Sequence, residues 1–161
     1  MAHSISGVLI QGSVDLDVAA SYDLFPLIDK AGIKFFPLDH YYLAYWSHKL
    51  GRPGRWEMPE SFPGTFPGCE VLRVLVGAVQ ARDAPFAIVM TEYFGGIGEQ
   101  WAAFVEGGKM IPQADINGVL SAFGVSPSGH LDAFEAYGFG DIRRNPQFLL
   151  KYGRWCRIYN V

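Results

Sequence analysis

The sequence is poor in the features that mark several classes of protein. It has only 2 cysteines in 161 residues, Cys69 and Cys156, too few for a disulfide framework. We therefore expect both thiols to be reduced and the protein to be cytoplasmic. The first residues lack the charged start and apolar run of a signal peptide, and no apolar run is long enough to span a bilayer. We accordingly expect no membrane partner.

Charged residues are also scarce. Asp, Glu, Lys and Arg make up 18% of the chain, and the net charge of −3 lacks the basic excess of a typical nucleic-acid-binding module. We therefore expect no nucleic-acid partner. Half of the residues are hydrophobic, which indicates a globular chain rather than a disordered one. The length predicts one domain over residues 1–161.

Residues 86–105 predict the centre of the fold. Segments 86–94 and 99–105 are rich in β-branched and aromatic residues, which suit a half-buried strand. Between them lies a glycine-rich segment, 95–98, whose glycines can adopt positive φ where the chain reverses. We predict an antiparallel hairpin here.

The remaining segments predict helices and shorter strands around this hairpin. Apolar residues at helical spacing predict helices near 17–31, 69–82 and 115–123, with a strand as the alternative for 69–82. Pro26 either kinks the first helix or divides it. Smaller elements are predicted as strands at 6–11, 33–36 and 110–111, a strand or helix start at 41–46, a short helix at 131–137, a helical turn after Pro146, and an edge strand at 155–159. The fold class is α+β, with a mainly antiparallel sheet packed by several helices.

A proline- and glycine-rich segment from Gly51 to Gly68 predicts a long loop. Charged side chains beside large aromatics are typical of a recognition surface. The alternative is an extended segment that wraps the core, with its aromatics as anchors. The candidate partner-binding residues on this loop are Arg55, Trp56, Glu57, Glu60 and Phe62.

Potential catalytic and metal-binding residues form no recognised motif. His40 and His48 have no zinc-site spacing, so the sequence predicts no metal and no cofactor. Cys69 lies at a predicted helix N-terminus, which would lower its pKa. Glu92 and Glu99 can face each other across the hairpin, but no sugar cleft accompanies them. The glycines at 95–98 lack the flanking residues of a phosphate-binding loop and predict a plain turn.

Four glycine- and aromatic-containing segments carry a family resemblance: residues 91–100, 104–108, 116–124 and 132–140. Their pattern resembles that of small bacterial proteins, some of which are similar to the immunity proteins of polymorphic or contact-dependent toxin systems. The similarity covers roughly residues 69–145. It implies an intracellular α+β protein that acts by binding and has no catalytic residues.

Two classes of function are therefore compared. The first is a non-catalytic protein that binds another protein, such as a toxin-neutralising immunity protein bound to its cognate toxin. The second is a small enzyme or small-ligand-binding protein with a pocket between helices and sheet. A deep pocket that holds His40, Glu92 or Cys69 would favour the second class. No pattern in the sequence indicates a particular oligomeric state.

Overall fold

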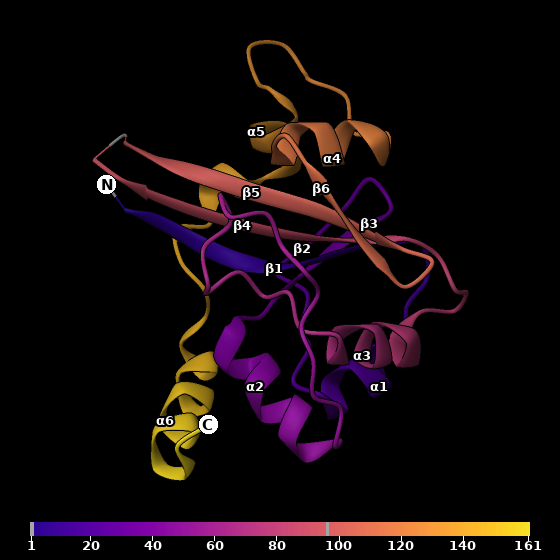
Figure 1. Ribbon diagram of the computed structural model, residues 1–161. Helices are drawn as coiled ribbons and strands as arrows, with labels where there is room; N and C mark the ends of the chain where they lie inside the picture. The colour runs from indigo at the N-terminus through magenta and orange to yellow at the C-terminus, as the bar shows by residue number, and fades with distance from the viewer. Residues whose placement is uncertain (1, 96) are drawn as a thin grey trace.

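The computed structural model describes residues 2–95 and 97–161 and shows one antiparallel sheet with helices on both faces (Figure 1). The sheet has the order β2-β3-β1-β4-β5-β6. This arrangement confirms the predicted α+β class. The strands are β1 His3–Gln11, β2 Ile28–Lys30, β3 Ile33–Pro37, β4 Phe86–Phe94, β5 Ile97–Glu106 and β6 Lys109–Gln113. The helices are α1 Leu16–Ser21, α2 His40–Lys49, α3 Val71–Val79, α4 Ile116–Ala122, α5 Ala133–Tyr137 and α6 Leu150–Tyr159.

The predicted central hairpin is confirmed. β4 and β5 pair continuously from Phe86 opposite Val105 to Phe94 opposite Ile97. β5 begins at Ile97, before the predicted start at residue 99. Gly95 has the positive φ expected of the turn. Gly96, also assigned to this turn, lies outside the described residues.

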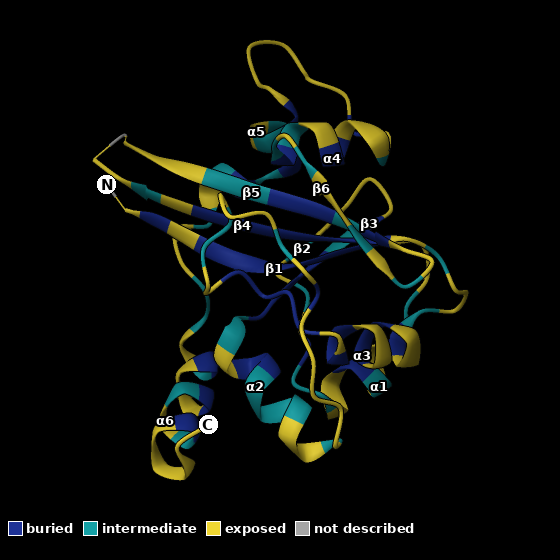
Figure 2. Cartoon of the chain, viewed as in Figure 1, coloured by how far each residue is buried: buried dark blue, intermediate teal, exposed yellow. Residues whose placement is uncertain are grey.

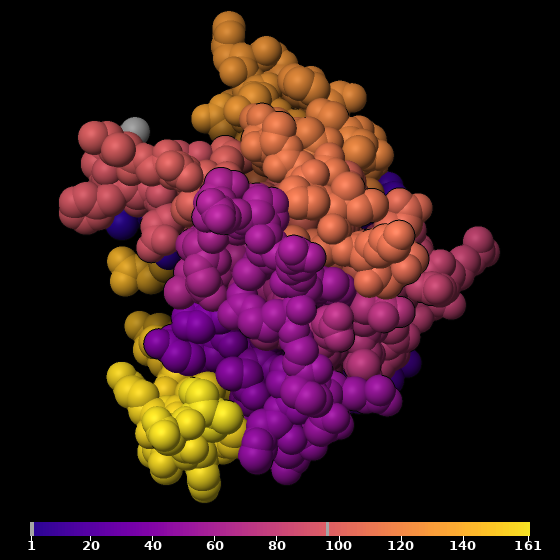
Figure 3. All heavy atoms as spheres, in the orientation of Figure 1, coloured from indigo at the N-terminus to yellow at the C-terminus, as the bar shows by residue number. Residues whose placement is uncertain are grey.

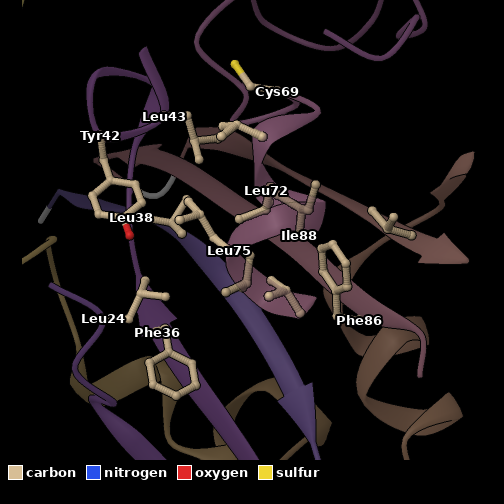
Figure 4. Close-up of a cluster of buried hydrophobic side chains, with 14 of the residues drawn as sticks. Leu24, Phe36, Leu38, Tyr42, Leu43, Cys69, Leu72, Leu75, Phe86 and Ile88 are labelled. Carbon is tan, nitrogen blue, oxygen red and sulfur yellow. The ribbon is translucent and has the colours of Figure 1, made fainter. Parts of the chain in front are cut away.

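The sheet has a separate hydrophobic core on each face, and Figure 2 shows the buried residues concentrated in the middle of its central strands. Successive residues of β1 point to opposite faces, so Val8 belongs to one core and Leu9 to the other. The first core lies under α1, α2 and α3, where Leu75 and Phe36 are buried (Figure 4). The second lies under α4 and α5. Burial on both faces makes the central strands nearly continuous apolar runs.

The predicted helix near 17–31 is wrong beyond residue 21. Asp15 caps α1 by accepting hydrogen bonds from the backbone N–H groups of Asp17 and Val18. Asp23 then adopts a left-handed backbone conformation with φ 55°, which ends helical geometry. Pro26 follows, and the chain continues as β2 rather than as a second helix. Neither predicted effect of Pro26, a kinked helix or two short helices, is observed, because the chain after α1 forms a strand.

Two aromatic segments, 41–46 and 155–159, are helical. Residues 41–46 belong to α2, the alternative left open for them, because the Asp39 carboxylate caps the helix through the Tyr42 N–H. The predicted edge strand at 155–159 is wrong, since these residues form the end of α6. The helix places Tyr152 and Cys156, four residues apart, on one buried face.

The other predicted elements are confirmed within a few residues. Helices occupy 71–79, 116–122 and 133–137, and a 3₁₀ turn, Gln147–Leu149, follows Pro146. The short strands near 6–11, 33–36 and 110–111 are β1, β3 and β6.

Candidate functional sites

The 51–68 segment is held against the first core by Trp56. Its side chain is 8% exposed and belongs to that core. Its backbone N–H donates to the carbonyl of Gly68 at 2.9 Å, and its indole N–H donates to the carbonyl of Gly108 at 3.3 Å. Trp56 thus fastens the segment to the turn between β5 and β6. This position fits the alternative that the segment wraps the core.

Arg55 and Phe62 also make contacts within the segment. The Arg55 guanidinium donates to the carbonyls of Gly64 at 3.1 Å and Phe66 at 3.0 Å. The ring of Phe62 packs edge-on against that of Phe66, with centroids 4.8 Å apart. Arg55 therefore closes the loop upon itself, and Phe62 is one of its internal contacts.

Glu57 and Glu60 remain on the surface of the segment. Both residues are exposed and make no side-chain hydrogen bond or ion pair with the residues that the structure describes. They are therefore the two predicted partner-binding residues whose polar groups are free for another molecule. A partner contact at any of the five residues stays a prediction.

The end of the β4–β5 hairpin carries an exposed apolar pair that the sequence did not single out. Phe94 is 80% exposed and Ile97 is 82% exposed, and the two lie directly opposite each other. They are the most exposed large hydrophobic residues among those the structure describes. Figure 1 shows this end of the hairpin projecting beyond the helices. Nothing in the described chain covers these two side chains.

A pair of carboxylates lies next to this apolar pair. Glu92 and Glu99 face each other across the hairpin, as predicted, and both are exposed. Because alternate residues share a face, they are on the same side of the sheet as Phe94 and Ile97. Directly opposed like charges destabilise a strand pair, so a cation placed between them would relieve repulsion.

The 51–68 segment reaches the same face of the hairpin. The indole N–H of Trp101, which lies two residues beyond Glu99, donates to the carbonyl of Ser61 at 3.0 Å. In Figure 3, part of the segment lies beside the base of the projecting hairpin end. Glu60 precedes Ser61 in this segment and is exposed. We call the group of Glu60, Glu92, Phe94, Ile97 and Glu99 the hairpin–loop surface.

The environment of Cys69 corrects the expected direction of its pKa. Burial raises the pKa of the thiol, and the nearby charge of Arg55 opposes this only in part. The prediction of a lowered pKa is therefore wrong, because the side chain is packed in the core at the start of α3. A protonated, buried thiol is a poor nucleophile.

The histidines have local structural contacts. His40 stacks on Tyr41 with ring centroids 3.9 Å apart, and burial lowers its pKa, with Asp39 opposing and Arg55 reinforcing the shift. His3 is buried and donates from Nε2 to the carbonyl of Phe139 at 2.9 Å. Its Nδ1 then accepts from the Thr91 hydroxyl at 2.7 Å. His3 thereby ties β1 and β4 to the segment after α5.

Within residues 2–95 and 97–161, no three His, Cys, Asp or Glu side chains are grouped so that they could hold a metal ion. No helix there combines the length and the hydrophobicity needed to cross a membrane.

A second feature that the sequence did not reveal is a pocket between α2 and α6. Its volume is about 380 Å³, and four aromatic residues form its walls. Asp23, from the loop after α1, accepts a hydrogen bond from the Tyr152 hydroxyl. The Lys151 ammonium lies 2.6 Å from the same carboxylate. Asp23 thus links the loop after α1 to α6.

These contacts predict a specific effect of pH on stability. Burial raises the pKa of Asp23, but the hydrogen bonds from Lys151 and Tyr152 and the Lys151 charge outweigh it, so the pKa is lowered. A carboxylate with a lowered pKa stabilises the fold above its ordinary value of about 3.9, and loses this contribution as pH falls through the lowered value. Asp23→Asn should therefore lower the free energy of unfolding by about 1 kcal/mol at neutral pH. The difference from wild type should shrink below about pH 4.

Urea unfolding of both proteins between about pH 7 and pH 3 measures this difference. Asn tolerates the left-handed backbone at position 23, so the substitution changes the charge with little strain. Asp141→Asn, which removes an exposed carboxylate elsewhere, is the matched control. A difference that stays constant down to pH 3 would contradict the assigned role of Asp23.

Comparison of the chain with protein-family models, curated proteins and solved structures finds no match. The resemblance to immunity proteins therefore rests on the glycine and aromatic patterns of the sequence and stays a prediction.

Proposed function

We propose that the protein acts by stoichiometric binding to a second protein, without turnover, and that it serves as a toxin-neutralising immunity protein. The observation that carries the binding proposal is the exposure of Phe94 and Ile97 at the end of a projecting hairpin. These two large apolar side chains are exposed to water at the end of a paired strand. A partner that covers them lowers the free energy of the system, because apolar surface is removed from water.

The charges beside this pair favour a basic partner. Glu92 and Glu99 place carboxylates next to the apolar pair, and Glu60 adds an exposed carboxylate on the segment that contacts Trp101. An apolar centre with a polar rim is the usual arrangement of a protein interface. The carboxylates would accelerate association with a positively charged surface and disfavour acidic ones. We therefore propose a partner that offers an apolar pocket surrounded by Lys or Arg.

The 51–68 segment contributes to this proposal through its exposed carboxylates. Trp56 and Arg55 hold the segment in shape, whereas Glu57 and Glu60 point their charges to solvent. The segment thus presents its acidic groups from a fixed backbone, which limits the ordering cost of binding.

The function is tested with the product of the reading frame directly upstream of the gene. We expect the two purified proteins to form a one-to-one complex by titration calorimetry, and co-expression to protect cells from that product. Absence of a complex, or a complex without protection, would overturn the immunity role.

The surface is tested by a double variant, Phe94→Ser with Ile97→Ser. Because both side chains are exposed, we expect the free energy of unfolding to stay within about 0.5 kcal/mol of wild type. Affinity for the upstream product should fall by about 2 kcal/mol or more, which is about 30-fold. Ile158→Ser, at another highly exposed isoleucine on α6, is the matched control and should bind normally. Wild-type affinity of the double variant would remove the hairpin end from the interface.

A further inference from the structure

The pocket between α2 and α6 has the composition of a site for an organic cation. Tyr45 lines the pocket and packs edge-on against three other rings. The centroid distances are 5.1 Å to Trp46, 5.1 Å to Tyr152 and 4.9 Å to Trp155. All four aromatic residues line the pocket. The negative faces of such rings attract a positive charge.

Asp23 supplies a carboxylate at the edge of these rings. Its side chain is 30% exposed and therefore reachable from solvent. Its backbone is left-handed, with φ 55°, a conformation that Asp adopts more readily than most residues other than glycine.

The protein already places a cation of its own in this pocket. The Lys151 ammonium lies 2.6 Å from the Asp23 carboxylate and 5.2 Å from the centroid of the Tyr152 ring. The Lys151 side chain is 52% exposed. An ion pair of this exposure contributes little to stability, so the flexible Lys151 side chain can leave the pocket at small cost.

We propose that the pocket between α2 and α6 binds a quaternary ammonium group, which takes the place of the Lys151 ammonium between Asp23 and the aromatic rings. The inference is independent of the proposed protein-binding function, because none of its residues belongs to the hairpin–loop surface. A quaternary ammonium suits the ring faces, because it has no N–H groups to satisfy and needs only the negative charge of Asp23 besides the rings.

The size of the pocket agrees with a small ligand. Its volume of about 380 Å³ lies near the lower end of the range for small-molecule sites. The ligand could be a free quaternary ammonium compound or a trimethylated lysine side chain of a peptide, since both present the same group.

The test uses the full-length protein and the indole N–H resonances of its 4 tryptophans. Trp46 and Trp155 line the pocket, whereas Trp56 and Trp101 bond elsewhere. Titration with tetramethylammonium chloride should shift the first two signals saturably, with a dissociation constant on the order of 1 mM. Sodium chloride at equal ionic strength should not. No saturable shift up to about 50 mM would overturn the proposal.

Two variants on α6 separate displacement of Lys151 from a general charge effect. Lys151→Met keeps the apolar stem but removes the competing ammonium, and should tighten tetramethylammonium binding about fivefold. Arg154→Met removes a nearby positive charge that does not line this pocket, and should leave binding unchanged. Equal tightening by both variants would contradict direct competition with Lys151.

The role of the Asp23 carboxylate and the source of the ligand are tested by the same titration. Asp23→Asn should weaken tetramethylammonium binding at least about fivefold in protein whose circular dichroism matches wild type. Unchanged affinity would contradict the role of the carboxylate. A trimethyllysine peptide that binds more tightly than tetramethylammonium assigns the site to a peptide partner. Binding of tetramethylammonium without tighter binding of the peptide assigns the site to a small-molecule ligand.

Discussion

Replacing Gly7 by alanine is expected to lower the free energy of unfolding by about 3 kcal/mol. Gly7 lies in β1, at the centre of the sheet, and pairs with β3 on one side and β4 on the other. A Cβ atom at this position would lie 2.3 Å from the carbonyl oxygen of Phe36 and 2.6 Å from the ring of Phe35. The backbone of β3 cannot move away from β1 without breaking the strand pairing. The clash therefore cannot be relieved without a large loss of stability.

Urea denaturation of the Gly7→Ala variant measures this loss. Gly77→Ala is the matched control, because Gly77 lies on the exposed face of α3 and a Cβ there meets nothing within 4 Å. That change should stabilise the protein by about 0.5–1 kcal/mol, since alanine favours a helix over glycine. A Gly7→Ala variant as stable as wild type would mean that β1 and β3 are not packed as closely as the structure shows.

The elements that the sequence predicted well are those whose local signals agree. The β4–β5 hairpin combines β-branched and aromatic strands with glycines at the turn, and α4 combines an Asp115 cap with apolar residues at helical spacing. The errors fall where the periodicity is ambiguous. Trp155–Tyr159 alternates like a strand, yet its packing on α2 depends on aromatic residues more than a hundred positions earlier in the chain.

The start of β2 had no local signal for its strand conformation. Leu24, Leu27 and Ile28 fit one face of a helix, but the positive φ of Asp23 and of Ala31 changes the direction of the chain. Asp23 and the Ala31–Gly32 pair are compatible with turns, but each also fits the end of a helix, so the sequence did not separate the two outcomes. The strand forms because β3 lies beside it, which is a tertiary effect.

The candidate surfaces depend on which residues the fold leaves uncovered. Phe94 and Ile97 have the same strand-like character as the buried Ile88, and they are exposed because their end of the hairpin projects beyond the helices (Figure 1). One local signal was available. Glu92 and Glu99 oppose each other in register, and two buried carboxylates could not do so. The residues beyond them, towards the turn, therefore had to lie outside the core.

The roles of the 51–68 segment can be separated by one substitution, Trp56→Ala. Its side chain is buried in the first core and its indole N–H bonds to Gly108, 52 residues away in sequence. Removal of a buried tryptophan leaves a cavity and an unpaired carbonyl, so we expect the free energy of unfolding to fall by about 3 kcal/mol. Trp56→Phe keeps most of the apolar contact and should cost about 1 kcal/mol.

The affinity of the same variants for the upstream product completes the test. If Trp56 only fastens the segment to the core, the folded Trp56→Ala protein should bind its partner within about 0.5 kcal/mol of wild type. The hairpin residues of the hairpin–loop surface would still be in place, because Phe94 and Ile97 lie on a different element. A Trp56→Ala variant that keeps its stability but loses about 2 kcal/mol of binding free energy would contradict the structural role of Trp56. Trp56 would then be an energetic anchor of the interface, as the composition of the loop predicts.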